Sequence, residues 1–188
     1  DLLVEVNPDV GGTITRVHHK RLSKDVLGSV PWESIDAPLD SFAARDEREW
    51  LTRYTGGWPL LFPNGGDACD FGGVFHGFHG EASIAPWDHE SKGASLTLRR
   101  RFVSVAAEME RVISVEGESV IVRENLVSTD KTSVAVMWGH HPSFGRDLLD
   151  GAFEITTGAA RVTADDSYDP LLNPFLPGAS GAWPKLPG

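Results

Sequence analysis

The feature that most constrains the fold of this chain is a series of strand-like segments separated by short polar turns. These segments span residues 94–104, 108–115, 119–128 and 133–139. In the first of them, Leu96, Leu98 and Phe102 alternate with polar residues, which is the period of a strand with one buried face. Because turns this short join antiparallel neighbours, the pattern predicts an all-β sandwich or barrel built from antiparallel sheets.

Further strands and one helix are expected elsewhere in the chain. The additional strand-like segments span residues 2–6, 13–17, 25–27, 153–157 and 161–163. The loop 7–12, which contains Gly11 and Gly12, predicts a hairpin between the first two of these. Residues 40–54 carry apolar side chains at helical spacing, with Asp40 or Ser41 as the N-cap and Gly56 as the stop.

Length and charge limit the classes of protein to consider. A chain of 188 residues can bury a sizeable core, and we expect one β-sandwich domain over residues 1–188. The formal net charge of −10 argues against nucleic acid and anionic lipid as partners. No apolar run approaches the ~20 residues of a membrane helix, so we expect no membrane partner. The single cysteine, Cys69, excludes an internal disulfide and fits a reducing compartment, which predicts a cytoplasmic protein.

Both ends of the chain suggest a piece of a longer protein, or a processed chain. The sequence begins directly with a strand-like segment at Asp1, without an initiator methionine or a signal peptide. Its last part, from Pro170 onward, is rich in proline and contains no closing element. We therefore expect the fold to be incomplete at its C-terminus.

Two segments carry the functional signal. Residues 56–87 are rich in glycine and contain His76 and His79, and residues 138–145 contain a second pair, His140 and His141. Glycine lets a backbone approach a ligand closely, and histidine exchanges protons near neutral pH. The hypothesis of a functional site depends on these two segments meeting in the fold.

The position of the second histidine pair follows from its strand. Residues 134–138 predict a buried strand, and Pro142 ends backbone pairing just after it. His140 and His141 are therefore expected at the rim of a sheet. Because adjacent strand residues point to opposite faces, at most one of the two should face a given pocket.

An ordered set of short motifs resembles the aldose 1-epimerase (galactose mutarotase-like) family. The motifs are Pro59-Leu-Leu-Phe-Pro63, His76-Gly-Phe78 followed by Trp87, and His141-Pro-Ser-Phe-Gly145. The resemblance implies a galactose mutarotase-like β-supersandwich of antiparallel sheets, of which this chain is the N-terminal and central part. It also implies interconversion of the α and β anomers of a free sugar by general acid–base ring opening.

The resemblance also implies roles for particular residues. His141 is the acid at the ring oxygen, and His76 is the second catalytic histidine. Sugar-binding residues are expected on both segments: Asn64, Asp67, His79, Trp87 and His140. No cofactor and no metal are implied, and a small-molecule sugar is the expected partner.

Departures from the family pattern leave alternatives open. Gly65 follows Asn64 where the family has an arginine, and the family's catalytic glutamate lies beyond the segment that resembles this chain. A non-catalytic carbohydrate-binding β-sandwich is therefore one alternative. Another is a cupin-like metal-binding protein, whose ligands would come from a set of polar residues on the two segments: His76, His79, His140, His141, Asp67 and Asp70.

Overall fold

The computed structural model describes residues 1–131, 133–149, 156–164 and 175–186. The chain divides into two compact units, Asp1–Gly151 and Ala152–Gly188. The expectation of one domain over residues 1–188 stays a prediction. None of the described helices is long and apolar enough to cross a membrane.

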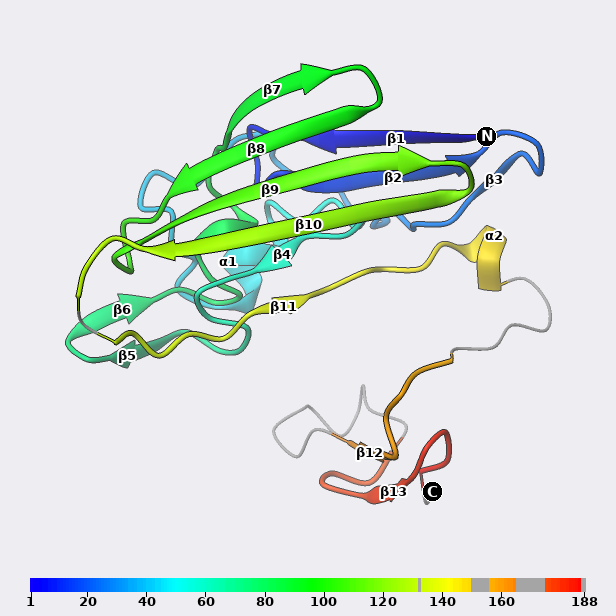
Figure 1. Cartoon of the computed structure of the whole chain (residues 1–188). Helices are drawn as coiled ribbons and strands as arrows, with labels where there is room; N and C mark the ends of the chain where they lie inside the picture. The colour runs from blue at the N-terminus through cyan, green and yellow to red at the C-terminus, as the bar shows by residue number, and fades with distance from the viewer. Residues whose placement is uncertain (132, 150–155, 165–174, 187–188) are drawn as a thin grey trace. The chain divides into compact units, whose positions relative to one another are not determined.

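The larger sheet of the first unit is an antiparallel meander (Figure 1). Its strands are β7 (Asp88–Lys92), β8 (Ser95–Arg101), β9 (Ala107–Glu116) and β10 (Ser119–Ser128), hydrogen-bonded in the order β10-β9-β8-β7. Arg111 on β9 lies directly opposite Glu124 on β10. The all-β, antiparallel prediction is confirmed, and the segments expected at 94–104, 108–115 and 119–128 become β8, β9 and β10.

A second sheet packs against the first through the main hydrophobic core. It consists of β1 (Leu2–Asn7), β2 (Thr13–His19) and β3 (Lys24–Asp25), in that order. Ile14 and Val17 of β2 belong to the same buried cluster as Leu98 of β8 and Met109 and Ile113 of β9. The predicted hairpin between the first two strands is confirmed.

The segment at residues 133–139 differs from its prediction. Only β11 (Gly139–His140) is a strand there, and Val134 and Met137 are 42% and 55% exposed. The backbone N–H of Met137 donates to the carbonyl of Pro63 at 2.8 Å, so this segment follows residues 56–87 and does not extend the β10 edge. An apolar run alone does not identify the partner that would bury it.

The helix is shorter than predicted. α1 spans Glu47–Leu51, and its N-cap is Asp46, whose carboxylate accepts from the backbone N–H of Glu49 at 2.8 Å. Phe42 has φ of 51°, a left-handed conformation that a helix cannot include. The capping residue is thus Asp46, closer to the buried Trp50 than the Asp40 or Ser41 expected.

Short elements complete the fold. In the first unit they are β4 (Leu60–Leu61), β5 (Cys69–Phe71), β6 (Val74–His76), the 3-10 helix η1 (Glu81–Ser83) and α2 (Arg146–Leu149). In the second unit β12 (Arg161–Thr163), as predicted, pairs with β13 (Ser180–Ala182). Of the strand expected at 153–157, residues 153–155 lie outside the described residues, and 156–157 form no strand.

Candidate functional site

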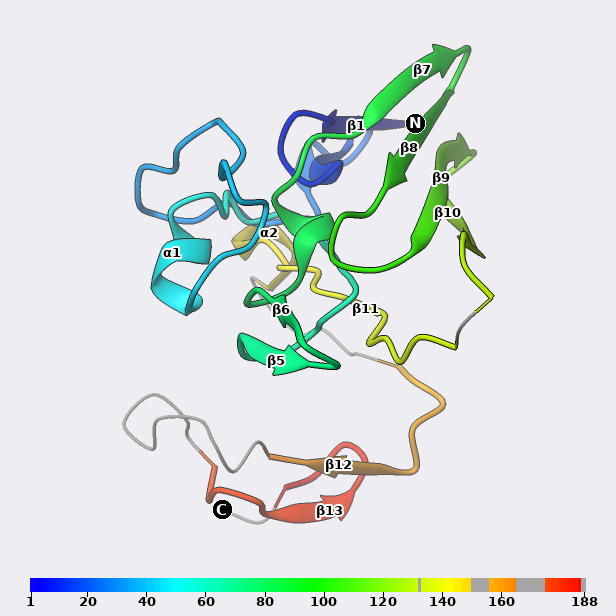
Figure 2. The ribbon, with the colours of Figure 1, turned by 90° about the vertical axis from the view of Figure 1, so that its left-hand side faces the viewer.

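The two histidine-bearing segments meet, as predicted. β4 pairs antiparallel with β11, with Leu60 opposite His140. One residue further on, the backbone N–H of His141 donates to the carbonyl of Pro59 at 3.2 Å. Figures 1 and 2 both show β11 close to the chain that carries β4 to β6. This pairing fixes the positions of His140 and His141 relative to residues 56–87.

His141 lies beside His79, one imidazole from each segment. Their ring centroids are 5.6 Å apart. The indole of Trp50 contacts both rings, with centroid distances of 4.8 Å to His79 and 5.9 Å to His141. His79 has φ of 58°, and its backbone N–H donates to the carbonyl of Gly66 at 3.0 Å. In the resulting aromatic cluster, Trp50–His79–His141, the indole is buried and both imidazoles are half-buried.

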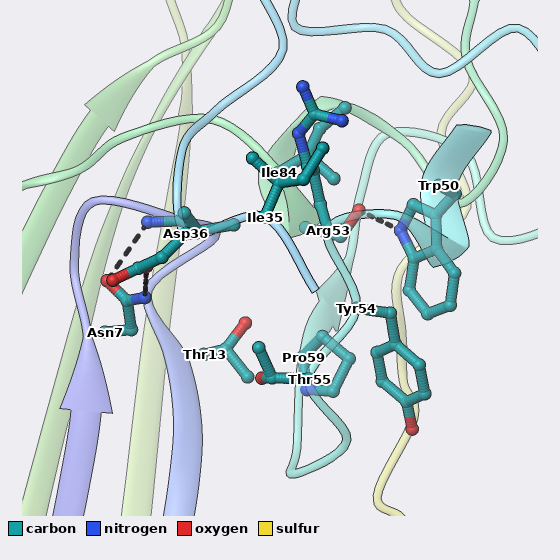
Figure 3. Close-up of a pocket in the computed structure, with 12 residues that line it drawn as sticks. Asn7, Thr13, Ile35, Asp36, Trp50, Arg53, Tyr54, Thr55, Pro59 and Ile84 are labelled. Carbon is teal, nitrogen blue, oxygen red and sulfur yellow. Dashed lines mark hydrogen bonds between the residues drawn. The ribbon is translucent and has the colours of Figure 1, made fainter. Parts of the chain in front are cut away.

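Tyr54 ties His141 to the helix. Its hydroxyl lies 3.5 Å from Nδ1 of His141 and hydrogen-bonds to the hydroxyl of Ser143. Its ring stacks on Trp50 at a centroid distance of 4.5 Å, and Trp50 Nε1 donates to Ser83 Oγ at 2.9 Å (Figure 3). Burial raises the pKa of Tyr54, against the effect of its bond to Ser143, so the phenol stays protonated near neutral pH. The cavity in Figure 3 beside these rings has only about 10 Å³, about enough for one water molecule.

His79 is a neutral imidazole at neutral pH. Burial lowers its pKa to about 4, and the nearby His141 adds to this effect. The carbonyl of Gly65 and the carboxylate of Asp67 oppose the shift but are outweighed. His79 therefore packs against His141 as an uncharged ring.

His140 points away from His141, as expected for adjacent residues on a strand. Its Nδ1 accepts from the indole N–H of Trp58 at 3.1 Å, and its Nε2 lies 3.4 Å from Oε2 of Glu124. A neutral imidazole in this arrangement carries its proton on Nε2, toward the carboxylate. His140 is therefore held between Trp58 and the larger sheet.

Glu124 continues this network into the core. Its Oε2 accepts from the indole N–H of Trp138 at 2.8 Å, and its Oε1 lies 3.1 Å from Nε of the fully buried Arg111. Arg111 also donates from Nη1 to the carbonyl of Gly12 at 3.0 Å. Burial lowers the pKa of Arg111 to about 10, although the charge of Glu124 opposes the shift.

The pKa of Glu124 shifts below its ordinary value even though its side chain is only 7% exposed. Burial alone would raise this pKa, but the hydrogen bond from His140 and the charge of Arg111 outweigh burial. Sequence reasoning missed this network, although two opposite charges placed equally far from the Gly117-Glu118 turn were a usable signal.

His76 lies in a separate place. It is 8% exposed and lines a cavity of about 240 Å³ between the β5–β6 hairpin and the segment that leads to β11. The cavity walls come from both segments: Pro63, Asn64, Cys69, Phe71, His76, Ala135, Val136 and Met137. No hydrogen bond or ring contact joins His76 to His141 within the described part of the chain.

The other expected sugar-binding residues differ in their surroundings. Asn64 is buried, and its side-chain amide donates to the carbonyls of Asp67 and Gly77 at 2.7 and 3.0 Å. Its side-chain oxygen accepts from the backbone N–H of Gly66 at 3.1 Å, so Asn64 organises its own loop. The side chain of Asp67 is exposed beside this loop.

Trp87 requires a correction. It was expected to offer an aromatic face to a sugar, but it is 3% exposed and belongs to the main core. Its ring contacts Phe102 at a centroid distance of 5.9 Å, and its N–H donates to the carbonyl of Ala82 at 3.2 Å. Both the apolar face and the polar edge of the indole are thus occupied by the protein itself.

No group of three or more histidine, cysteine, aspartate or glutamate side chains is placed to hold a metal ion within the described residues.

Comparison of the chain with protein-family models, with curated protein sequences and with solved structures finds no match in any of the three.

Proposed function

We propose that this chain is part of an aldose 1-epimerase-like protein, which interconverts the α and β anomers of a free sugar by general acid–base ring opening. The observation that carries the proposal is the direct pairing of the two histidine-bearing segments through β4 and β11. This pairing brings together residues that lie about eighty positions apart in the sequence, as the hypothesis of a functional site requires.

His141 is the proposed acid. Its imidazole is half-buried, with Tyr54 near Nδ1 and the neutral ring of His79 at its side. An imidazole held in one orientation suits proton transfer to a sugar ring oxygen. Protonation of that oxygen weakens its bond to C1, the ring opens to the aldehyde, and closure on the other face gives the second anomer.

His76 and Asn64 supply the proposed sugar-facing wall. They line the same cavity of about 240 Å³, just below the roughly 300–1,000 Å³ of typical small-molecule pockets. His141 is not among the residues that line this cavity, so a sugar bound there must extend beyond it to reach the imidazole of His141. No carboxylate among the described residues is assigned the role of the base that removes the C1 hydroxyl proton. The resemblance implies a glutamate for that role, C-terminal to His141-Pro142.

A non-catalytic carbohydrate-binding β-sandwich is the second candidate function. One observation favours it: the described residues that line the cavity of about 240 Å³ include no carboxylate that could act as the base. Such a protein would bind a sugar on the same face without accelerating ring opening.

Polarimetry of freshly dissolved α-glucose and α-galactose, in the presence of the full natural protein, tests both candidates. We expect optical rotation to relax faster than in buffer, and His141→Gln to abolish the acceleration. His89→Gln, an exposed histidine on β7, is the matched control and should keep full activity. Full activity of His141→Gln would refute the acid assignment, and sugar binding without acceleration would favour the binding module.

A further inference from the structure

The β5–β6 hairpin places the only cysteine of the chain opposite a buried histidine. Cys69 and His76 are directly paired in the antiparallel register, so their side chains lie on the same face of the hairpin. In such a pair the Cβ atoms lie about 4.5–5.5 Å apart. Gly72 and Gly73 form the two-residue turn, with φ of 61° and 79°. Positive φ at both central residues matches the right-handed twist of the flanking strands.

The imidazole of His76 has an acceptor position that nothing in the described residues fills. His76 is 8% exposed, and its Nδ1 is buried without a hydrogen-bond partner. A buried polar atom without a partner costs free energy and calls for an explanation. The reactive group opposite His76 on the hairpin is the thiol of Cys69. This thiol is exposed and makes no hydrogen bond with His76 in this structure.

Both residues line the cavity of about 240 Å³, whose other walls are mainly apolar. Phe71 lies on the hairpin itself, and Val136 and Met137 come from the segment before β11. A ligand that reaches the thiol here therefore places its body against aromatic and aliphatic carbon. These walls favour a short apolar chain over a charged group.

We propose that Cys69 and His76 form a thiol–imidazole pair that adds to soft carbonyl electrophiles, specifically α,β-unsaturated aldehydes with a short apolar tail. Rotation of the Cys69 side chain toward His76 lets the S–H donate to Nδ1, and the thiolate is the reactive form. This inference goes beyond the proposed sugar chemistry and does not depend on it.

The reaction balances without any further reagent. The thiol proton passes to Nδ1 of His76, and the sulfur electron pair forms a bond to the β-carbon of the enal. The carbon–carbon π pair shifts to give an enolate, and the imidazolium returns the proton to the α-carbon. The product is a saturated aldehyde joined to the protein through a thioether, with no atom lost and no change in overall oxidation state.

The test is the rate of addition of trans-2-hexenal, followed by loss of free thiol and by intact mass. Because Cys69 is the only cysteine, loss of thiol reports one site. At neutral pH we expect the natural protein to react at least about tenfold faster than glutathione, within the range of general-base assistance. His76→Gln should remove this advantage, Cys69→Ser should remove the adduct, and His89→Gln should change neither.

Two further measurements keep the inference testable if His76→Gln alters folding. The rate of the natural protein should level off at a lower pH than the rate of glutathione, because the imidazole of His76 takes the thiol proton. Met137→Ser should reduce the preference for hexenal over acrolein, which has no tail. A rate equal to that of glutathione, or a fast rate that a folded His76→Gln variant retains, would overturn the pairing.

Discussion

The buried ion pair between β9 and β10 allows a sharp test of the core. Glu124→Gln keeps the size and the hydrogen-bonding shape of the side chain but removes its charge. Among the described residues it leaves the guanidinium of Arg111 with no ion-pair partner, although Arg111 is fully buried and its Nε lies 3.1 Å from the carboxylate. Breaking one partner of such a pair typically costs about 3–5 kcal/mol, because a charge stays buried and unpaired.

An exposed pair on the same sheet gives the matched control. Arg99 and Glu110 are ion-paired at 2.8 Å across β8 and β9, with side chains 54% and 44% exposed. Glu110→Gln also removes one negative charge from the sheet, here from β9. It should lower the free energy of unfolding by no more than about 1 kcal/mol, since water solvates the remaining Arg99. The comparison therefore separates the effect of burial from the effect of net charge.

Urea unfolding of the natural protein and of both variants measures the difference. We expect the midpoint of Glu124→Gln to fall clearly below that of Glu110→Gln, with a similar slope. The double variant Arg111→Met/Glu124→Leu should recover most of the loss, because an apolar pair carries no buried charge. Equal stability of the two single variants would refute the argument that the buried charge of Arg111 depends on Glu124.

Two further predictions concern the site and its loop. The pKa of His79 is about 4 in the folded protein against an ordinary 6.5, so the unfolded chain binds this proton more readily. His79 therefore contributes stability that is complete above pH 6.5 and is lost as pH falls toward 4, up to about 3 kcal/mol. The difference in unfolding free energy between the natural protein and His79→Gln should change over this range, and a constant difference would contradict the shift. Gly80→Ala should be far more costly than Gly93→Ala, by at least about 2 kcal/mol. Both glycines have positive φ, 74° and 60°, but a Cβ at Gly80 would lie 2.4 Å from the carbonyl oxygen of Phe62, whereas nothing lies within 4 Å of one at Gly93. Chemical denaturation compares the two variants, and equal losses would show that φ alone sets the cost.

Much of the β architecture could be predicted from local pattern. The alternation of Leu96 and Leu98 with polar residues is a property of the chain itself, because side chains on a strand alternate between faces whatever the partner. The short turns between segments then allow only antiparallel neighbours, and β8, β9 and β10 follow. Recurrent glycine and histidine likewise marked the two segments that pair through β4 and β11.

The identity of the side chains that meet depends on tertiary structure. His79, rather than His76, lies next to His141, because Cys69 pairs with His76 in a hairpin that turns it toward a different cavity. Trp87 shows the same limit: its sequence neighbourhood suggested a ligand, and the packing of the two sheets places it in the core.

What the sequence alone determined was thus the period of its strands, the positions of its turns and the two segments that carry histidine. Only the tertiary structure decided which partner each segment found. The run at residues 134–138 is as apolar as a buried strand, yet it stays exposed because its backbone follows Pro63 instead of joining β10. Periodicity is a local property, whereas burial depends on surfaces that come from distant parts of the chain.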